Sequence, residues 1–159
     1  MITAYNKFHE RKFDLDLPVH IFGTSSKGNS VYLSRLHTLI DLGLPYIRYS
    51  EVNPNFFLDV DYLILTHIHG DHINPSTLKK IINDFPNVKI IMSKEMAQGI
   101  LTTPRLNHVL TPQFIQEHIH RFQTAMPTIL KTRTGLDFEF TPHKVPHGEL
   151  VNIAIELND

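Results

Sequence analysis

The chain has 159 residues, of which 42% are hydrophobic and 19% are charged, and its formal net charge is −1. This composition excludes a disordered protein, a collagen, a coiled coil and a strongly basic nucleic-acid tail, and the length predicts one domain over residues 1–159. The chain contains 11 histidines and no cysteine. A disulfide is therefore excluded, and a bound metal ion would need imidazole and carboxylate ligands.

The first residues contain no long apolar run, and no stretch approaches the roughly 18 apolar residues of a membrane-spanning helix. We therefore expect neither a targeting segment nor a membrane span. The absence of cysteine is consistent with the cytoplasm, which is the location we expect.

The first third of the chain predicts short strands separated by turns. Runs of β-prone residues lie on either side of a cluster of turn residues at Gly23–Ser30. The expected elements are strands at Val19–Phe22, Val31–Leu33 and Thr38–Ile40, followed by a short helix or turn at Tyr46–Glu51.

The middle of the chain predicts alternating strands and helices. Its first strand is a continuous apolar run of the length expected for a strand buried on both faces. Asn74 and Pro75 are typical of a helix N-terminus, and Ser93 and Thr111 are suited to cap two more helices. The expected elements are strands at Asp61–Thr66 and Val88–Met92 and helices at Ser76–Phe85, Lys94–Leu101 and Thr111–Phe122.

After Pro127 the pattern returns to strands, which we expect at Thr128–Thr132, Leu136–Phe140 and Leu150–Leu157, with a turn at Gly135. Alternating strands and helices followed by further strands indicate an α/β fold with a mixed sheet.

Four potential metal ligands, His67, His69, Asp71 and His72, follow the buried central strand. In an extended segment, residues two apart point the same way and lie about 6.6 Å apart, so His67 and His69 are able to bind one ion at about 2.0–2.1 Å. Gly70 permits a sharp turn, after which Asp71 and His72 are able to face a second ion. Two ions that share an oxygen would hold a hydroxide, which is a good nucleophile at neutral pH.

Two other interpretations of this cluster stay open. In the first, the cluster arises by chance in a histidine-rich chain. In the second, the same residues form an inert structural zinc site. The position in a loop after a buried strand, where ligands commonly bind, argues against chance. We assign no role to His118 and His120, because two positions apart on a helix they face different sides. We also assign none to the histidines without ligand-spaced companions, which are His9, His20, His37 and His108.

Residues 66–72, THIHGDH, resemble the T-H-x-H-x-D-H signature of the metallo-β-lactamase-fold hydrolases. The resemblance implies that His67 and His69 bind one metal ion together with a histidine far downstream, and that Asp71 and His72 bind a second ion. It implies one or two zinc ions as cofactor, with manganese as an alternative. It also implies a metal-bound hydroxide as the nucleophile, with Asp71 as metal ligand and proton acceptor.

The resemblance places the downstream histidine in a turn between strands, and Pro142–Gly148 is similar to that element. We select His147, because Val145–Gly148 followed by a strand is most similar to the family's pattern. His143 is the alternative ligand, and each of the two is also compatible with a plain surface histidine in a turn.

Two upstream elements extend the resemblance. Residues 22–30, FGTSSKGNS, resemble the loop between the first two strands in the branch that hydrolyses phosphodiesters. Such a loop is able to turn backbone N–H groups toward an anion, and Lys27 adds a charge, although similar loops also serve as plain hairpin turns. Residues 39–43 resemble a strand end that places Asp41 beneath the metal site, either to accept a hydrogen bond from a ligand histidine or to cap a turn.

Members of this family contain two βα halves in four αββα layers, and the resemblance covers the first half, from Val19 onward. We therefore expect a βα half-sandwich with a mixed sheet, incomplete relative to the usual fold. Beyond His147, Glu149, Glu156 and Asp159 are poor substitutes for the bridging aspartate and last histidine of the family. Three explanations stay open: a fragment, a half completed by another chain, and a natural short form.

The resulting hypothesis is a metal-dependent hydrolase that cleaves phosphodiester bonds of a nucleotide or a nucleic acid. The alternatives are a hydrolase of acyl bonds, such as a thioester or a lactam, and a truncated metal-binding domain without catalysis. The expected partners are the phosphodiester substrate and either a second copy of the chain or a complementing second half. The near-neutral net charge neither requires nor excludes a nucleic acid.

Overall fold

The computed structural model describes residues 3–6, 11–14, 19–147 and 150–158, and the side-chain surroundings of residues 19–144. Six strands form the central sheet in the order β3-β4-β5-β6-β7-β8. Their bounds are β3 Val19–Ser25, β4 Gly28–Leu33, β5 Thr38–Ile40, β6 Tyr62–Ile64, β7 Lys89–Ser93 and β8 Ile119–Phe122. Strands β3 to β5 pair antiparallel and strands β5 to β8 pair parallel, which confirms the predicted mixed sheet.

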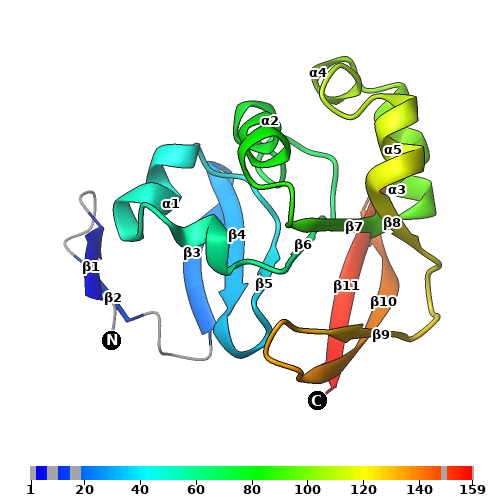
Figure 1. The fold of residues 1–159 in the computed structure, drawn as a ribbon. Helices are drawn as coiled ribbons and strands as arrows, with labels where there is room; N and C mark the ends of the chain where they lie inside the picture. Colours follow the sequence, from blue (N-terminus) through cyan, green and yellow to red (C-terminus); the bar gives the residue numbers. More distant parts are fainter. Residues whose placement is uncertain (1–2, 7–10, 15–18, 148–149, 159) are drawn as a thin grey trace.

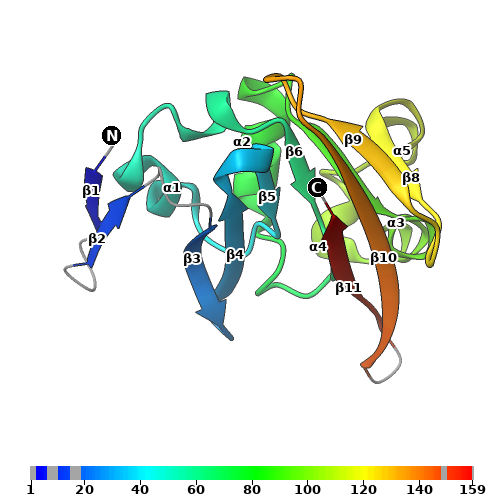
Figure 2. The same cartoon turned by 90° about the horizontal axis from the view of Figure 1, so that it is seen from below.

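Two smaller antiparallel sheets accompany the central one. Strands β9 Thr128–Lys131, β10 Asp137–His147 and β11 Leu150–Asn158 form a sheet in the order β11-β10-β9, and β1 Thr3–Asn6 pairs with β2 Arg11–Asp14. Figure 2 shows the β3–β4 and β10–β11 hairpins projecting at the same edge of the molecule.

Helices lie on one face of the central sheet, and β9–β11 lie against its other face beside β6 to β8 (Figures 1 and 2). The α-helices are α1 Tyr46–Val52, α2 Pro75–Asp84, α3 Lys94–Leu101, α4 Pro104–Asn107 and α5 Pro112–His118, with 3₁₀ turns at Ser34–Leu36 and Phe56–Asp59. None of the helices in the described ranges is long and apolar enough to cross a membrane.

Strands β6 and β7 have apolar side chains on both faces, as the continuous apolar runs predict. On one face, Leu63 and Ile90 belong to the larger apolar cluster, which also includes buried residues of α2, α3 and α5. On the opposite face, Ile64 and Ile91 pack in a second cluster with Phe138 and Phe140 of β10. The sheet is therefore the middle layer of three, and its interior strands are shielded from water.

Three helices begin as their N-cap residues predict. In each, the side chain of the residue before the helix accepts a hydrogen bond from a backbone N–H: Asn74 before α2 at 3.0 Å, Ser93 before α3 at 3.0 Å and Thr111 before α5 at 3.2 Å. These bonds satisfy N–H groups that have no partner within the helix.

The structure corrects three of the sequence-based expectations. Helix α5 ends at His118 rather than at Phe122, because Ile119–Phe122 pairs with β7 as strand β8. The turn cluster Gly23–Ser30 is mostly paired strand, and the turn contains only the residues between Ser25 and Gly28. Helix α4 was not predicted, since four residues are too few to show a helical period.

Arg133 connects the turn between β9 and β10 to the segment before β6. Its backbone N–H donates to Asp61 Oδ2 at 2.8 Å, its Nε donates to Asp61 Oδ1, and its Nη1 donates to the carbonyl of Leu58 at 2.6 Å. The side chain of Asp61 is only 13% exposed. This arginine therefore helps to hold the third layer on the sheet.

We predict that Arg133→Ala lowers the free energy of unfolding by about 1 kcal/mol, because the substitution removes the Nε bond to the mostly buried Asp61 and the Nη1 bond to the Leu58 carbonyl. Urea denaturation of the metal-free chain measures the change. Arg121→Ala, which truncates an exposed arginine on β8, is the control and should shift stability by less than about 0.5 kcal/mol. Equal losses in the two variants would contradict the assignment.

Candidate metal centre

The predicted ligands lie in a loop that follows β6, and we refer to residues 67–72 as the histidine loop. The carbonyl of His69 accepts hydrogen bonds from the N–H groups of His72 and Ile73, both at 3.0 Å, which turns the chain back on itself. The backbone of Leu42, just after β5, then pairs with the returning segment, donating to the His72 carbonyl at 2.8 Å. The loop is thus held against the carboxyl ends of two neighbouring parallel strands, where α/β sheets commonly bind ligands.

The first two histidines face each other. His67 Nε2 and His69 Nδ1 are 2.6 Å apart, and the two rings are nearly perpendicular, at 85°. His67 is 1% exposed, whereas His69 is an exposed residue. The two side chains therefore lie on the same side, as residues two apart in an extended segment should, and the pair reaches from the interior to the surface.

Asp71 and His72 form a second pair beside the first. His72 Nε2 is 3.6 Å from Asp71 Oδ2, and the ring centroids of His67 and His72 are 5.1 Å apart. The side-chain amide of Asn29 donates to Asp71 Oδ2 at 3.0 Å, and the Asn29 backbone N–H donates to the Asp71 carbonyl at 2.6 Å. The sequence does not identify Asn29 as a site residue, because its partner Asp71 lies 42 positions away in the chain.

Asp41, at the end of β5, lies beneath the histidine loop and accepts three hydrogen bonds. The donors are His72 Nδ1 at 2.8 Å, the Thr66 backbone N–H at 2.8 Å and the Thr66 hydroxyl at 2.6 Å. Because Asp41 occupies Nδ1, the other ring nitrogen of His72 is turned toward Asp71. Asp41 therefore accepts a hydrogen bond from a candidate ligand histidine and orients its ring, which is one of the two roles expected for it.

The same carboxylate governs the charge of His72. The hydrogen bond that His72 donates to Asp41 raises the pKa of His72 above its ordinary value, burial of the ring opposes the shift, and the charge of Asp41 adds to it. In the metal-free chain His72 consequently holds its proton more strongly than an exposed histidine does.

Two glycines near the site differ from the sequence expectation. Gly70 has no backbone conformation in the left-handed region, and an added Cβ would meet nothing within 4 Å, so the turn does not need a glycine there. At Gly43, an added Cβ would overlap the Asp71 carbonyl oxygen and lie 2.6 Å from the Asn29 backbone nitrogen. The close approach of backbones that builds the site therefore depends on Gly43.

The expected downstream histidines lie on a strand and not in a turn. Strand β10 continues through Pro142–His147, because it pairs along its length with β11, with His143 opposite Ala154. The side chain of His143 is exposed, and that of His147 lies outside the described residues. The final residue of β10 lies at the hairpin end that projects at the same edge as the β3–β4 hairpin (Figure 2).

The four loop side chains form two pairs, and within the described side chains no group of three or more histidine or acidic residues is arranged to hold a metal ion. Their donor atoms nevertheless suit a divalent cation, since imidazole nitrogens and a carboxylate oxygen face one another. Two nitrogens on a tetrahedral zinc ion lie about 3.3 Å apart, so His67 and His69 would need to separate by about 0.7 Å. A side-chain adjustment of this size fits the site to a metal.

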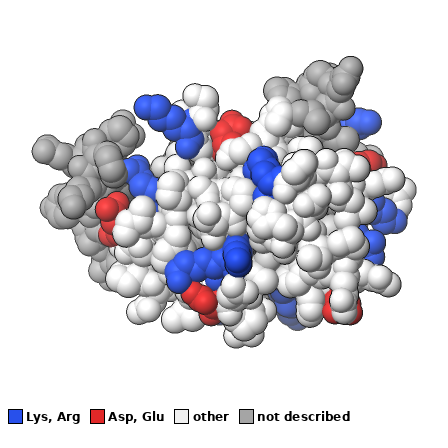
Figure 3. Space-filling model, turned by 90° about the horizontal axis from the view of Figure 1, so that it is seen from above, with Lys and Arg blue, Asp and Glu red and all other residues white. Residues whose placement is uncertain are grey.

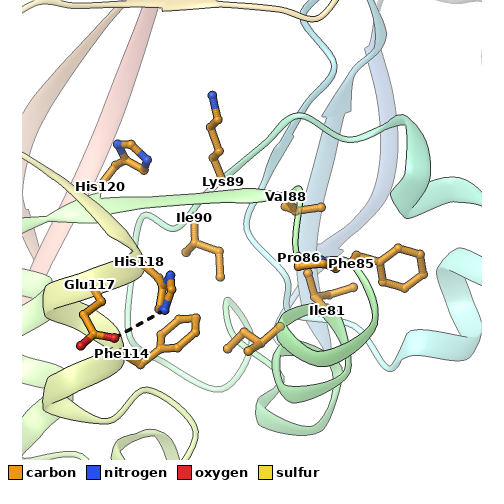
Figure 4. Close-up of a pocket in the computed structure, with 11 residues that line it drawn as sticks. Ile81, Phe85, Pro86, Val88, Lys89, Ile90, Phe114, Glu117, His118 and His120 are labelled. Atoms are coloured by element: carbon orange, nitrogen blue, oxygen red, sulfur yellow. Dashed lines mark ion pairs between the residues drawn. The ribbon is translucent and has the colours of Figure 1, made fainter.

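A separate cleft of about 410 Å³ between α2 and α5 contains no residue of the histidine loop. Figure 4 shows Phe114 and Ile90 on one side of the strands, whereas Lys89 and His120 point away on the other side. His118 in this cleft pairs with Glu117 at 3.7 Å. His120 lies on β8, not on a helix as expected, and the cleft takes no part in the metal centre.

No protein-family model matches the sequence, and no curated protein matches it. Solved structures do match. YhfI from Bacillus subtilis, a metallo-β-lactamase fold protein, has a TM-score of 0.56 and 20% identity over 89% of this chain and 57% of its own. The chemotaxis sensor ODP, solved as a peroxy diiron species, has a TM-score of 0.54 and 12% identity over 86% of this chain and 53% of its own. The short form of human tRNase Z has a TM-score of 0.46 and 17% identity over 89% of this chain and 64% of its own.

The chain therefore has the metallo-β-lactamase fold, as the pattern of the histidine loop predicts. It spans 57% of the YhfI chain and 53% of the ODP chain, so it corresponds to part of the fold in these structures. This agrees with the expected incomplete α/β sandwich.

We predict that Gly43→Ala lowers the free energy of unfolding by roughly 1–3 kcal/mol, because the methyl group forces the Asp71 and Asn29 backbones apart. Gly70→Ala is the matched control and should leave stability within about 0.5 kcal/mol, since the added methyl meets open space. Thermal and urea unfolding measure both variants. A tolerated Gly43→Ala would show that the two backbones separate without cost.

We predict that His72 in the metal-free chain titrates above the ordinary value of 6.5 and that Asp41→Asn returns its pKa toward that value. The stabilisation from the charged pair is complete below about pH 6.5 and is lost as the pH rises through the higher pKa of the folded state. NMR titration of the imidazole C–H signals measures both proteins. A pKa of 6.5 or lower for His72 in the unmodified chain would contradict this account.

Proposed function

We propose that this chain is the metal-binding part of a hydrolase that cleaves phosphodiester bonds of a nucleotide or a nucleic acid. The observation that carries the proposal is the convergence of His67 Nε2 and His69 Nδ1 beside the Asp71–His72 pair. Three imidazoles and a carboxylate in one loop supply nitrogen and oxygen donors of the kind that bind a divalent cation.

In this proposal His67 and His69, with His147, hold one ion, and Asp71 and His72 contribute to a second. When bound, a zinc or manganese ion lowers the pKa of water and stabilises negative charge that develops on oxygen. The peroxy diiron species of ODP, on a similar fold, supports a pair of neighbouring ions as one form of the site.

The chain's own residues orient and accept protons. Asp41 holds Nδ1 of His72, so Nε2 is presented to the site. The Asn29 amide holds Oδ2 of Asp71, which leaves the other carboxylate oxygen to accept a proton as the reaction proceeds. The exposed side of His69 leaves the site open to a substrate.

The phosphodiester substrate is proposed from the tip of the β3–β4 hairpin. Lys27 and Ser26 form the turn there and are exposed, and Asn29 connects the hairpin directly to Asp71. A cation and a hydroxyl group at the tip of a hairpin that contacts Asp71 favour an anionic substrate over a neutral one. Figure 3 shows Lys and Arg scattered among neutral and acidic side chains on the face seen from above.

A second candidate function is a metal-binding domain without catalysis, completed by a second copy of the chain or by a complementing half. The observations that favour it are an outer strand and exposed apolar side chains. Within the described chain, β11 pairs with β10 and forms an outer strand of its sheet, and Val19 and Ile21 on β3 are 49% and 55% exposed. Open strands and exposed apolar side chains favour association with another chain.

The cytoplasmic location stays a prediction.

We predict that the purified chain binds about one zinc ion, and that His67→Ala, His69→Ala and His147→Ala each abolish tight binding because three imidazoles hold it. His118→Ala, in the separate cleft, is the control and should bind as the unmodified chain does. Metal analysis after dialysis measures the ratio of zinc to protein. Full zinc in His147→Ala together with its loss in His143→Ala would transfer the third ligand to His143.

We predict that the metal-loaded chain, alone or with its completing partner, hydrolyses bis(4-nitrophenyl) phosphate faster than a chromogenic β-lactam or a thioester. Asp71→Asn should lower this activity at least about tenfold, because a metal ligand and proton acceptor is lost. A faster β-lactam or thioester reaction would establish the acyl-hydrolase alternative. Tight zinc binding without hydrolysis of any of the three compounds would support the second candidate function.

A further inference from the structure

The short helix α4, Pro104–Asn107, brings a partly buried cation to the histidine loop. Leu106 is fully buried in the larger apolar cluster and anchors the helix. Arg105, the preceding residue, sends its guanidinium group to the loop, where Nη1 donates to the carbonyl of Ile73 at 2.9 Å and Nη2 donates to the carbonyl of Ile68.

The two carbonyls that Arg105 contacts bracket three of the four candidate ligands, His69, Asp71 and His72. Ile68 lies between His67 and His69, and Ile73 follows His72. The planar guanidinium presents its donors as a rigid fork, so one side chain fixes the spacing between the two ends of the loop. The His69 carbonyl closes the same turn from within, through the N–H groups of His72 and Ile73.

The position of this arginine carries an electrostatic cost that its contacts must offset. Burial lowers the pKa of Arg105, and the negative charge of Asp71 acts in the opposite direction. A guanidinium keeps its proton in proteins, so a full positive charge stands near the carboxylate of Asp71. Charge-assisted hydrogen bonds to two backbone carbonyls compensate for the partial burial of the guanidinium group.

We propose that Arg105 is a positioning residue, whose guanidinium holds the histidine loop in the form in which His67, His69 and His72 face one site. The effect on metal binding rests on the proposed function, whereas the effect on loop conformation does not. The two effects are therefore measured separately.

The first experiment measures amide hydrogen exchange in the metal-free chain, with a chelator present. In Arg105→Ala, the amides of His72 and Ile73 should exchange about tenfold faster or more, because the turn that protects them opens locally. Arg133→Ala is the matched control, since it removes another arginine bonded to a backbone carbonyl but far along the chain from the loop. Equal protection of the His72 and Ile73 amides in the two variants would overturn the proposal.

The second experiment measures zinc affinity by competition with a chelator. Arg105→Ala should bind zinc roughly 10–100-fold more weakly, as loss of an outer partner of a metal site does, and Arg133→Ala should bind normally. Arg105→Lys should recover only part of the affinity, because one ammonium group does not reproduce the fork. This variant also serves in both experiments if Arg105→Ala does not fold.

The outcomes separate the two proposals. If the unmodified chain does not bind zinc, the proposed function fails, and hydrogen exchange alone decides the role of Arg105. If the unmodified chain binds zinc and Arg105→Ala binds it equally well, the positioning role is wrong while the metal-binding function stands.

Discussion

A single buried carboxylate, that of Asp41, holds the candidate site to the sheet. It is 5% exposed and adopts a left-handed backbone conformation with φ of 61°, which aspartate tolerates better than most residues. Burial of a carboxylate is costly unless donors surround it. Thr66 and His72 supply three such donors, so the ends of β5 and β6 and one candidate ligand are held around the same atoms.

Around this carboxylate, backbone atoms rather than side chains form most of the framework. Backbone hydrogen bonds join Leu42 to His72 and Asn74, Asn29 to Asp71, and Gly43 to Asn29. The hydroxyl of Ser30 donates to the Asp41 carbonyl at 2.8 Å. Bonds between backbones require close approach, so the side chain at position 43 must be absent. The exposed positions of the loop, such as Gly70, face no comparable restriction.

The histidine loop is supported from two sides by rigid elements. Asn29 on β4 holds Asp71, and Arg105 on α4 holds the carbonyls of Ile68 and Ile73. Two such supports limit the movement of the loop, as contacts that surround a binding site do. Long-range contacts with the sheet and with α4 thus prepare a site that the loop sequence alone leaves flexible.

Local sequence determined the features that depend on near neighbours in the chain. Spacings of two to four residues determine the N-caps at Asn74 and Ser93 and the placing of His67 and His69 on the same side of the chain. Short apolar runs likewise determine the buried strands β6 and β7. Tertiary pairing overrode such a signal at Ile119–Phe122. The sequence there is compatible with a helix, but the segment pairs with β7 as strand β8. Only the tertiary structure decided which residues support the ligands, because Asn29, Asp41 and Arg105 lie 42, 31 and 37 positions from their partners in the loop. No local pattern encodes contacts across such separations, since they form only when packing of the sheet and helices brings those segments together.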